Sequence, residues 1–173
     1  MIFRPFRTFL AICALAQFQV CIAILSNRTV DDFNGDLITG FLPLYEPQNA
    51  WNTDGNCTSC SVKPDPTQAL DHTWHDSSQR AGDSPSSVTL QFTGTAIYLF
   101  CIVPADDATN LVNLTFTLDG TFTGAYTHTP IGSKDISYLV PVLATGGFNN
   151  TPHTLVARTA SPSLFIFDYA MYT

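Results

Sequence analysis

The feature that most constrains the fold of this chain is a recurring alternation of apolar and polar residues in short segments. Val88–Phe92 and Leu114–Leu118 place apolar side chains at every second position, and Ala96–Val103 is apolar throughout. Alternation with a period of two is typical of a strand with one buried face, whereas a short apolar run suits a strand buried on both faces. No segment after the N-terminal region sustains the 3.6-residue period of a helix, so the chain is predicted to be all-β.

Turn signals separate these segments. Asp119-Gly120 is a strong hairpin signal, Thr93–Thr95 is predicted to turn the chain, and Gly146–Asn150 is predicted to be a loop. Further strands are expected over residues 28–32, 122–128, 137–143, 153–157 and 164–171. About eight short strands without crossover helices predict a two-sheet antiparallel β-sandwich of the jelly-roll type. An immunoglobulin domain is disfavoured because the Cys–Trp–Cys spacing is missing.

Composition supports an all-β domain and excludes some partners. Glu46 is the single Glu among fourteen acidic residues and only two Lys are present, so strong helix formers are scarce. The net charge is −7, and loss of Arg4 and Arg7 with the N-terminal segment would change it to −9. A chain this acidic is not expected to bind nucleic acid or an anionic membrane.

The N-terminal segment predicts secretion. Arg4 and Arg7 precede an apolar run, Thr8–Leu25, that contains small residues suited to cleavage. Residues 1–23 are therefore expected to be a signal peptide, cleaved between residues 16 and 26. The alternative is an uncleaved segment that anchors the protein in a membrane. Otherwise the mature chain is expected to have no membrane span. It would form one domain over 27–173, with a long irregular loop over 33–86.

Four glycosylation sequons agree with an extracellular location. They begin at Asn27, Asn56, Asn113 and Asn149, and four in a chain with a signal peptide indicate a glycosylated surface.

The cysteines fit the same compartment. Cys57 and Cys60 form a C-x-x-C motif. A zinc site would need a second ligand pair, and a redox motif would need a βαβ unit. The motif is therefore interpreted as a small local disulfide, and Cys101, in an apolar strand, as a buried free thiol.

Several stretches resemble one group of proteins. They are Thr29–Asp32, Phe92–Tyr98, His153–Val156 and Phe167–Tyr169, and Pro64–Trp74 fits the long loop of the same group. The chain resembles a secreted or single-pass ectodomain family of mushroom-forming fungi, whose members are similar to galactose-binding-like jelly rolls. This resemblance covers most of the mature chain, implies a jelly-roll fold and implies no activity, because a fold does not fix a function.

The resemblance also implies a metal candidate. In galactose-binding-like jelly rolls the first and last strands lie together, and Asp168 resembles a carboxylate that holds structural Ca²⁺ in some of them. Asp32 could supply a partner, although Ca²⁺ requires six to eight oxygens. The alternative is that both carboxylates accept backbone hydrogen bonds or cap turns. No other cofactor is expected.

The candidate ligand-binding residues lie in the long loop. Asp71, His72, His75 and Asp76 form its densest polar cluster. A transition-metal site is disfavoured there because no helix places the two imidazoles on one face. The aromatic residues Tyr45, Trp51 and Trp74 could stack on sugar rings or could close one end of the sandwich.

These observations predict a non-catalytic extracellular module that binds a glycan or cell-wall ligand at the fungal surface. The alternative is a structural or adhesion ectodomain that binds another extracellular protein. A glycoside hydrolase is less favoured, because no recognisable pair of catalytic carboxylates or nucleophile motif is present.

Overall fold

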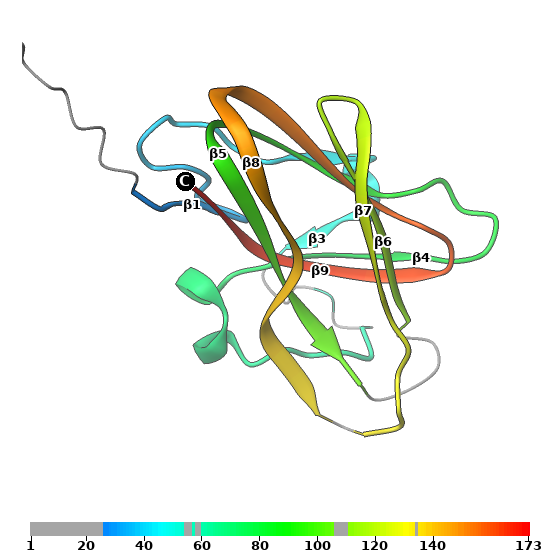
Figure 1. The fold of residues 1–173 in the computed structure, drawn as a ribbon. Helices are drawn as coiled ribbons and strands as arrows, with labels where there is room; N and C mark the ends of the chain where they lie inside the picture. Colours follow the sequence, from blue (N-terminus) through cyan, green and yellow to red (C-terminus); the bar gives the residue numbers. More distant parts are fainter. Residues whose placement is uncertain (1–25, 54–56, 58–59, 106–110, 134) are drawn as a thin grey trace, which may run out of the picture.

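The computed structural model describes residues 26–53, 57, 60–105, 111–133 and 135–173 (Figure 1). The predicted signal peptide therefore lies outside the described residues. The described chain is all-β, as the sequence predicts, with nine strands. These are β1 (Arg28–Asp31), β2 (Leu44–Glu46), β3 (Asn52–Thr53), β4 (His75–Gln79), β5 (Ser87–Pro104), β6 (Val112–Leu118), β7 (Thr121–His128), β8 (Ile136–Thr159) and β9 (Ser163–Tyr172). Its helical elements are three single 3-10 turns, η1 (Gln48–Ala50), η2 (Pro66–Gln68) and η3 (Leu70–His72). No helix within these ranges is long and apolar enough to cross a membrane.

Two long strands, β5 and β8, run through both layers of the sandwich. The first part of β5, up to Gly94, pairs with the last part of β8, and the second part of β5 pairs with the first part of β8. One layer has the order β7–β6–β8–β5–β2, and the other adds β9, β4 and β3 to the second part of β5, with β1 also paired to β9. In Figure 1, β5 and β8 cross over β9 on their way from one layer to the other.

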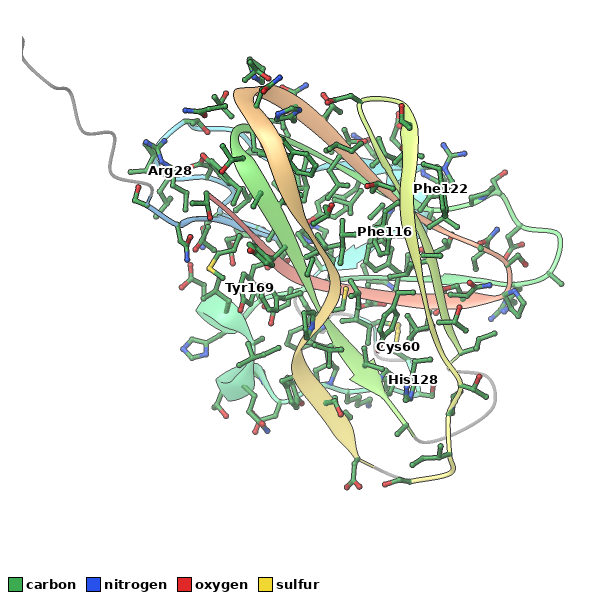
Figure 2. All side chains as sticks on the ribbon, in the orientation of Figure 1. Arg28, Cys60, Phe116, Phe122, His128 and Tyr169 are labelled. Atoms are coloured by element: carbon green, nitrogen blue, oxygen red, sulfur yellow. A yellow bond between two sulfur atoms is a disulfide. The ribbon has the colours of Figure 1, made fainter. Side chains whose placement is uncertain are left out.

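The core fills the space between the layers. Phe116 from β6 and Phe165 and Phe167 from β9 are fully buried there, and Figure 2 shows Phe116 among the side chains between the ribbons. Burial of β6 alternates residue by residue, as its sequence predicts. Each fully buried side chain of this size contributes roughly 1.5–3 kcal/mol to the stability of the domain.

A second, smaller core lies on the other face of β9. Trp74 packs there with Ile102, Leu164 and Ile166, and it is 4% exposed. The segment that contains η2 and η3 therefore covers the outer face of this layer.

Two predicted chain breaks lie inside long strands. The predicted turn at Thr93–Thr95 is wrong, because β5 continues through it with a shift of register between Gly94 and Ala96. The predicted Gly146–Asn150 loop lies within β8, where residues 147–150 bulge out of the pairing with β5 between Thr151 and Gly146. In both places glycine lets a long strand bend between layers without ending it. The region 33–86 is also more regular than predicted, since it contains β2, β3, β4 and the three 3-10 turns.

The local predictions agree with the structure. Asp119 and Gly120 both have positive φ, +51° and +78°, and they join β6 to β7. Cys57 and Cys60 form a disulfide, and Cys101 is a buried free thiol.

Gly94 provides a test of this architecture. An added Cβ would lie 2.4 Å from the carbonyl oxygen of Thr173, which also accepts a hydrogen bond from the Thr95 N–H. Gly94→Ala should therefore lower the free energy of unfolding by about 1–3 kcal/mol, the usual cost of overpacking. The matched control is Gly124→Ala, whose Cβ would meet its nearest neighbour at an ordinary 3.7 Å. Equal stability of the two variants in urea denaturation would contradict the bend at Gly94.

Candidate functional site

A cleft of about 640 Å³ opens where β2 of one layer faces β4 of the other. Its lining combines aromatic rings with polar and charged groups. The lining residues are Pro43, Leu44, Tyr45, Glu46, Pro47, Gln48, Trp51, Thr53, His75, Pro85, Ser87 and Arg158. Three of the predicted ligand-binding residues, Tyr45, Trp51 and His75, therefore meet at one site.

The rings in the cleft form a connected group. Tyr45 stacks on His75 with ring centroids 3.9 Å apart and planes 5° apart, and Trp51 lies 4.9 Å from Tyr45. Trp51 also contacts Phe165 edge-on at 5.3 Å. Tyr45 and Trp51 are half-buried and pack against the main core. They thus both close the edge of the sandwich and present part of their surface to the cleft.

Local backbone structure places these rings. Tyr45 lies opposite Val88 in the β2–β5 pairing, and its hydroxyl donates a 2.7 Å hydrogen bond to the backbone carbonyl of Asp32. Burial raises the pKa of Tyr45 far above its usual value, and nearby Asp32 and Asp31 add to the effect, so the hydroxyl stays a donor. The indole Nε1 of Trp51 donates to the carbonyl of Glu46 at 3.3 Å, across the η1 turn.

A buried carboxylate holds His75. Asp32 is 1% exposed, and its Oδ2 lies 2.7 Å from Nδ1 of His75. Its other oxygen accepts a 2.5 Å hydrogen bond from the Thr73 hydroxyl. The end of β1 is thereby tied to the start of β4, behind the rings of the cleft.

Two further carboxylates lie near Asp32, and each has one buried oxygen without a hydrogen-bond partner. Asp31 accepts hydrogen bonds from the N–H groups of Phe33 and Asn34 through Oδ1, whereas its Oδ2 has none. Asp168 accepts from the N–H of Leu70 through Oδ1, and its Oδ2 also has none. Burial raises the pKa of Asp31, and it raises the pKa of Asp168 to about 7, with smaller contributions from Asp32 and Asp31.

The structure disperses the other predicted ligand-binding residues. Trp74 lies in the second core and not in the cleft. Asp71 and His72 are exposed in η3, where Asp71 accepts a hydrogen bond from Asn34 and His72 contacts the carbonyl of Pro66.

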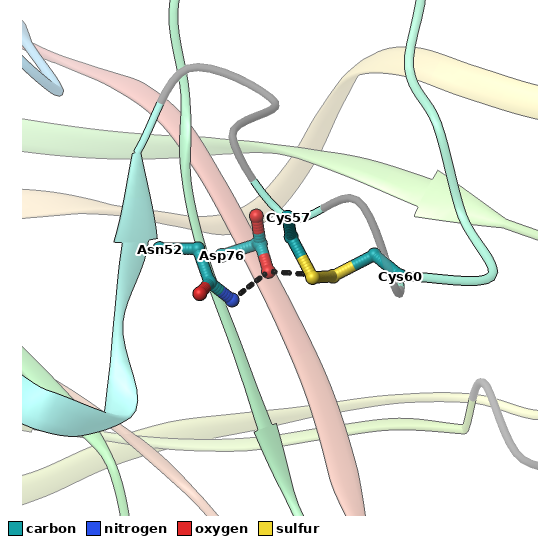
Figure 3. The surroundings of a disulfide bond; sticks show 4 residues. All are labelled: Asn52, Cys57, Cys60 and Asp76. Carbon is teal, nitrogen blue, oxygen red and sulfur yellow. Dashed lines mark hydrogen bonds between the residues drawn. A yellow bond between two sulfur atoms is a disulfide. The ribbon is translucent and has the colours of Figure 1, made fainter.

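Asp76 is buried beside the disulfide. It accepts a 2.9 Å hydrogen bond from Asn52, and one of its oxygens lies 3.8 Å from Sγ of Cys60 (Figure 3). Burial raises the pKa of Asp76 despite that hydrogen bond. The contacts of Asp76 thus connect β3, β4 and the disulfide loop, so its observed role is structural.

Asp32 and Asp168, the predicted calcium ligands, lie next to each other and are joined by a backbone hydrogen bond. The N–H of Asp32 donates to the carbonyl of Asp168 at 3.1 Å, but the carboxylate of Asp32 is engaged by Thr73 and His75. The unpartnered oxygens belong to Asp31 and Asp168 instead. Among the residues that the structure describes, no three or more His, Cys, Asp or Glu side chains are placed to hold a metal ion.

Sequence reasoning missed several residues of this site. Gln48 and Arg158 line the cleft from η1 and β8, and Thr73 supports Asp32.

The fold is similar to that of a solved carbohydrate-binding module. A family 35 carbohydrate-binding module from Clostridium thermocellum aligns with a TM-score of 0.50 and 6% identity, over 85% of this chain and 97% of that one. The TmCBM61 structure in complex with β-1,4-galactotriose gives a TM-score of 0.44 and 11% identity, over 75% and 87% of the two chains. An exo-β-1,3-galactanase from Phanerochaete chrysosporium gives a TM-score of 0.46 and 9% identity. The alignment covers 86% of this chain but only 30% of the enzyme.

No protein-family model and no curated protein matches the chain. At this identity the likeness to the family 35 module shows the fold alone, namely a β-sandwich.

Asp168 gives the site a testable dependence on pH. Its folded-state pKa of about 7 lies above that of an unfolded Asp, so the folded protein holds a proton that the unfolded chain releases between pH 4 and 7. The contribution of Asp168 to stability is therefore largest below pH 4 and is lost as the pH rises through 7.

Asp168→Asn removes this ionisation and can keep the hydrogen bond from Leu70. In metal-free buffer the variant and wild type should have the same melting temperature at about pH 4.5. At pH 8 the melting temperature of the variant should be about 5 °C higher. A difference in melting temperature that does not change between these pH values would contradict the raised pKa.

Proposed function

We propose that this chain is a secreted, N-glycosylated, non-catalytic module that binds a glycan in the cleft formed by Tyr45, Trp51 and His75. The observation that carries the proposal is the pairing of partly exposed aromatic rings with a polar rim in one open cleft. The similarity to a carbohydrate-binding module supports it at the level of fold.

The chemistry of the cleft suits a sugar. The C–H faces of a sugar ring pack well on an aromatic surface, and its hydroxyls need hydrogen-bonding groups at the edge. Trp51 and Tyr45 supply the surface, and Glu46, Gln48 and Arg158 supply the rim.

The carboxylates of the cleft favour binding over hydrolysis. Glycoside hydrolases commonly need two facing carboxyl groups, and Glu46 is the one carboxylate among the described lining residues. Asp31, Asp32 and Asp168 are buried, have structural partners and do not line the cleft.

Positions of the sequons agree with glycosylation in a secretory compartment. Asn27 and Asn149 are exposed, and Asn113 points away from the core on β6. Asn56 lies outside the described residues.

Trp51 offers the direct test. Trp51→Ala should weaken binding to insoluble β-glucan or chitin at least tenfold in pull-down assays, because it removes much of the stacking surface. The matched control is Phe122→Ala, since Phe122 is an aromatic residue on β7 that is 65% exposed and does not line the cleft. Circular dichroism should show that both variants fold. Failure of the wild-type protein to bind any polysaccharide on a glycan array would reject the proposal.

We also propose a structural Ca²⁺ ion beside Asp168, because its unpartnered buried oxygen and that of Asp31 could both accept a cation. Calcium would then raise the melting temperature of wild type at pH 8, and EDTA would lower it. With calcium present, Asp168→Asn would become less stable than wild type, the reverse of the order expected without metal. An identical melting temperature in calcium and in EDTA would reject the ion.

A second candidate function is adhesion to another protein. Phe33, Leu37, Ile38, Leu42 and Leu44 are all more than half exposed within one short segment, which is typical of a protein-binding surface. Retention on intact cells that is lost in a Leu37→Ser/Ile38→Ser variant but kept in Trp51→Ala would favour this candidate over glycan binding.

A further inference from the structure

His75 combines three properties that Tyr45 and Trp51 do not have together. It is 8% exposed, it lines the cleft, and one of its ring nitrogens is bound to a buried carboxylate. Its orientation is fixed on two sides, by the 2.7 Å contact with Asp32 and by the parallel stack on Tyr45. The ring therefore has little freedom to rotate or flip.

The contact with Asp32 determines the tautomer of His75. A carboxylate accepts hydrogen bonds and has no proton to give, so Nδ1 of His75 carries the proton of this pair. In the neutral ring Nε2 is then an acceptor with a free lone pair. His75 lines the cleft, and within the described part of the chain its hydrogen bonds run through Nδ1, which leaves Nε2 as the ring nitrogen that can bind a ligand.

We propose that Nε2 of His75 selects the ligand by accepting a hydrogen bond from a sugar hydroxyl, with Asp32 as the positioning residue. This inference rests on the proposed glycan-binding function and narrows its ligand class. The lone pair of Nε2 favours a free, donating hydroxyl and disfavours a carboxylate or sulfate, which can only accept. Glu46 and Arg158 also give the described rim one charge of each sign. The preferred ligand is therefore a neutral sugar with an unsubstituted hydroxyl at this position.

The chain contains a matched control for this residue. His153 also places Nδ1 2.7 Å from a carboxylate oxygen, that of Asp119, and both imidazoles are 10% exposed. His153 does not line the cleft. A substitution of His153 therefore removes a His–Asp contact without changing the cleft, whereas a substitution of His75 changes both.

The binding experiment uses three hexasaccharide probes in calorimetric titrations: laminarihexaose, chitohexaose and hexagalacturonic acid. Wild type should bind at least one neutral probe more tightly than the acidic one. His75→Asn, which can still donate to Asp32 but lacks Nε2, should bind that neutral probe about ten- to a hundredfold more weakly. All proteins are produced in a host without N-glycosylation, because this change creates an Asn-Asp-Ser sequon. His75→Gln, whose amide oxygen can reach the position of Nε2, should recover part of the affinity. His153→Asn should bind like wild type.

The outcomes separate this inference from the proposed function. Equal binding by His75→Asn and wild type, or preference for hexagalacturonic acid, would overturn the role of His75 and leave glycan binding intact. Absence of wild-type binding to every probe would reject the proposed function.

A measurement without ligand tests the tautomer of His75, whether or not any probe binds. ¹⁵N NMR of the wild-type imidazole in its neutral form should show Nδ1 protonated and Nε2 unprotonated. A neutral ring with the proton on Nε2 would overturn the inference.

Discussion

The pairing of β5 with β8 is the constraint on which the rest of this structure depends. These two strands pair along nearly their whole length and supply hydrogen-bonding edges to both layers. The start of β5 holds β2, which carries Tyr45, and its second part holds β9, which in turn pairs with β4 and positions His75. The stacked contact between Tyr45 and His75 therefore joins side chains from the two layers, and the cleft exists because both layers are anchored to the same strands.

Three buried acidic residues are energetically unfavourable in this arrangement. Asp31, Asp32 and Asp168 are all buried, and hydrogen bonds hold each of them, with a further contact between Asp32 and His75. Ionised carboxyl groups in such a setting are unfavourable unless they are well bonded. Asp32 is bonded through both oxygens, whereas Asp31 and Asp168 each have one bare oxygen and a raised pKa. A proton or a cation bound at Asp31 and Asp168 would relieve the repulsion between the carboxylates. If a proton is bound, Asp168→Asn should raise the melting temperature at pH 8, whereas if a cation is bound it should lower it.

The sequence predicted the features that local chemistry controls. Alternating residues in β6, the Asp119-Gly120 turn and the Cys57–Cys60 disulfide all depend on neighbours within a few positions. The continuity of β5 through Gly94 was not predictable, because the strand there packs against Thr173, which is distant in the sequence. The positions of the two tryptophans also depend on tertiary contacts and could not be predicted. Trp51 and Trp74 look alike in the sequence, and only the tertiary structure places one in the cleft and the other in the core.

The central claim is that a glycan binds against Trp51, and the two tryptophans allow a direct measurement. Each indole N–H gives a separate signal in a ¹⁵N–¹H correlation spectrum, and Trp51 lines the cleft whereas Trp74 is buried elsewhere. Titration with laminarihexaose or chitohexaose should shift the Trp51 indole signal in a saturable manner and leave the Trp74 signal in place. Saturable binding that shifts the Trp74 signal alone, or neither signal, would contradict a sugar site in this cleft.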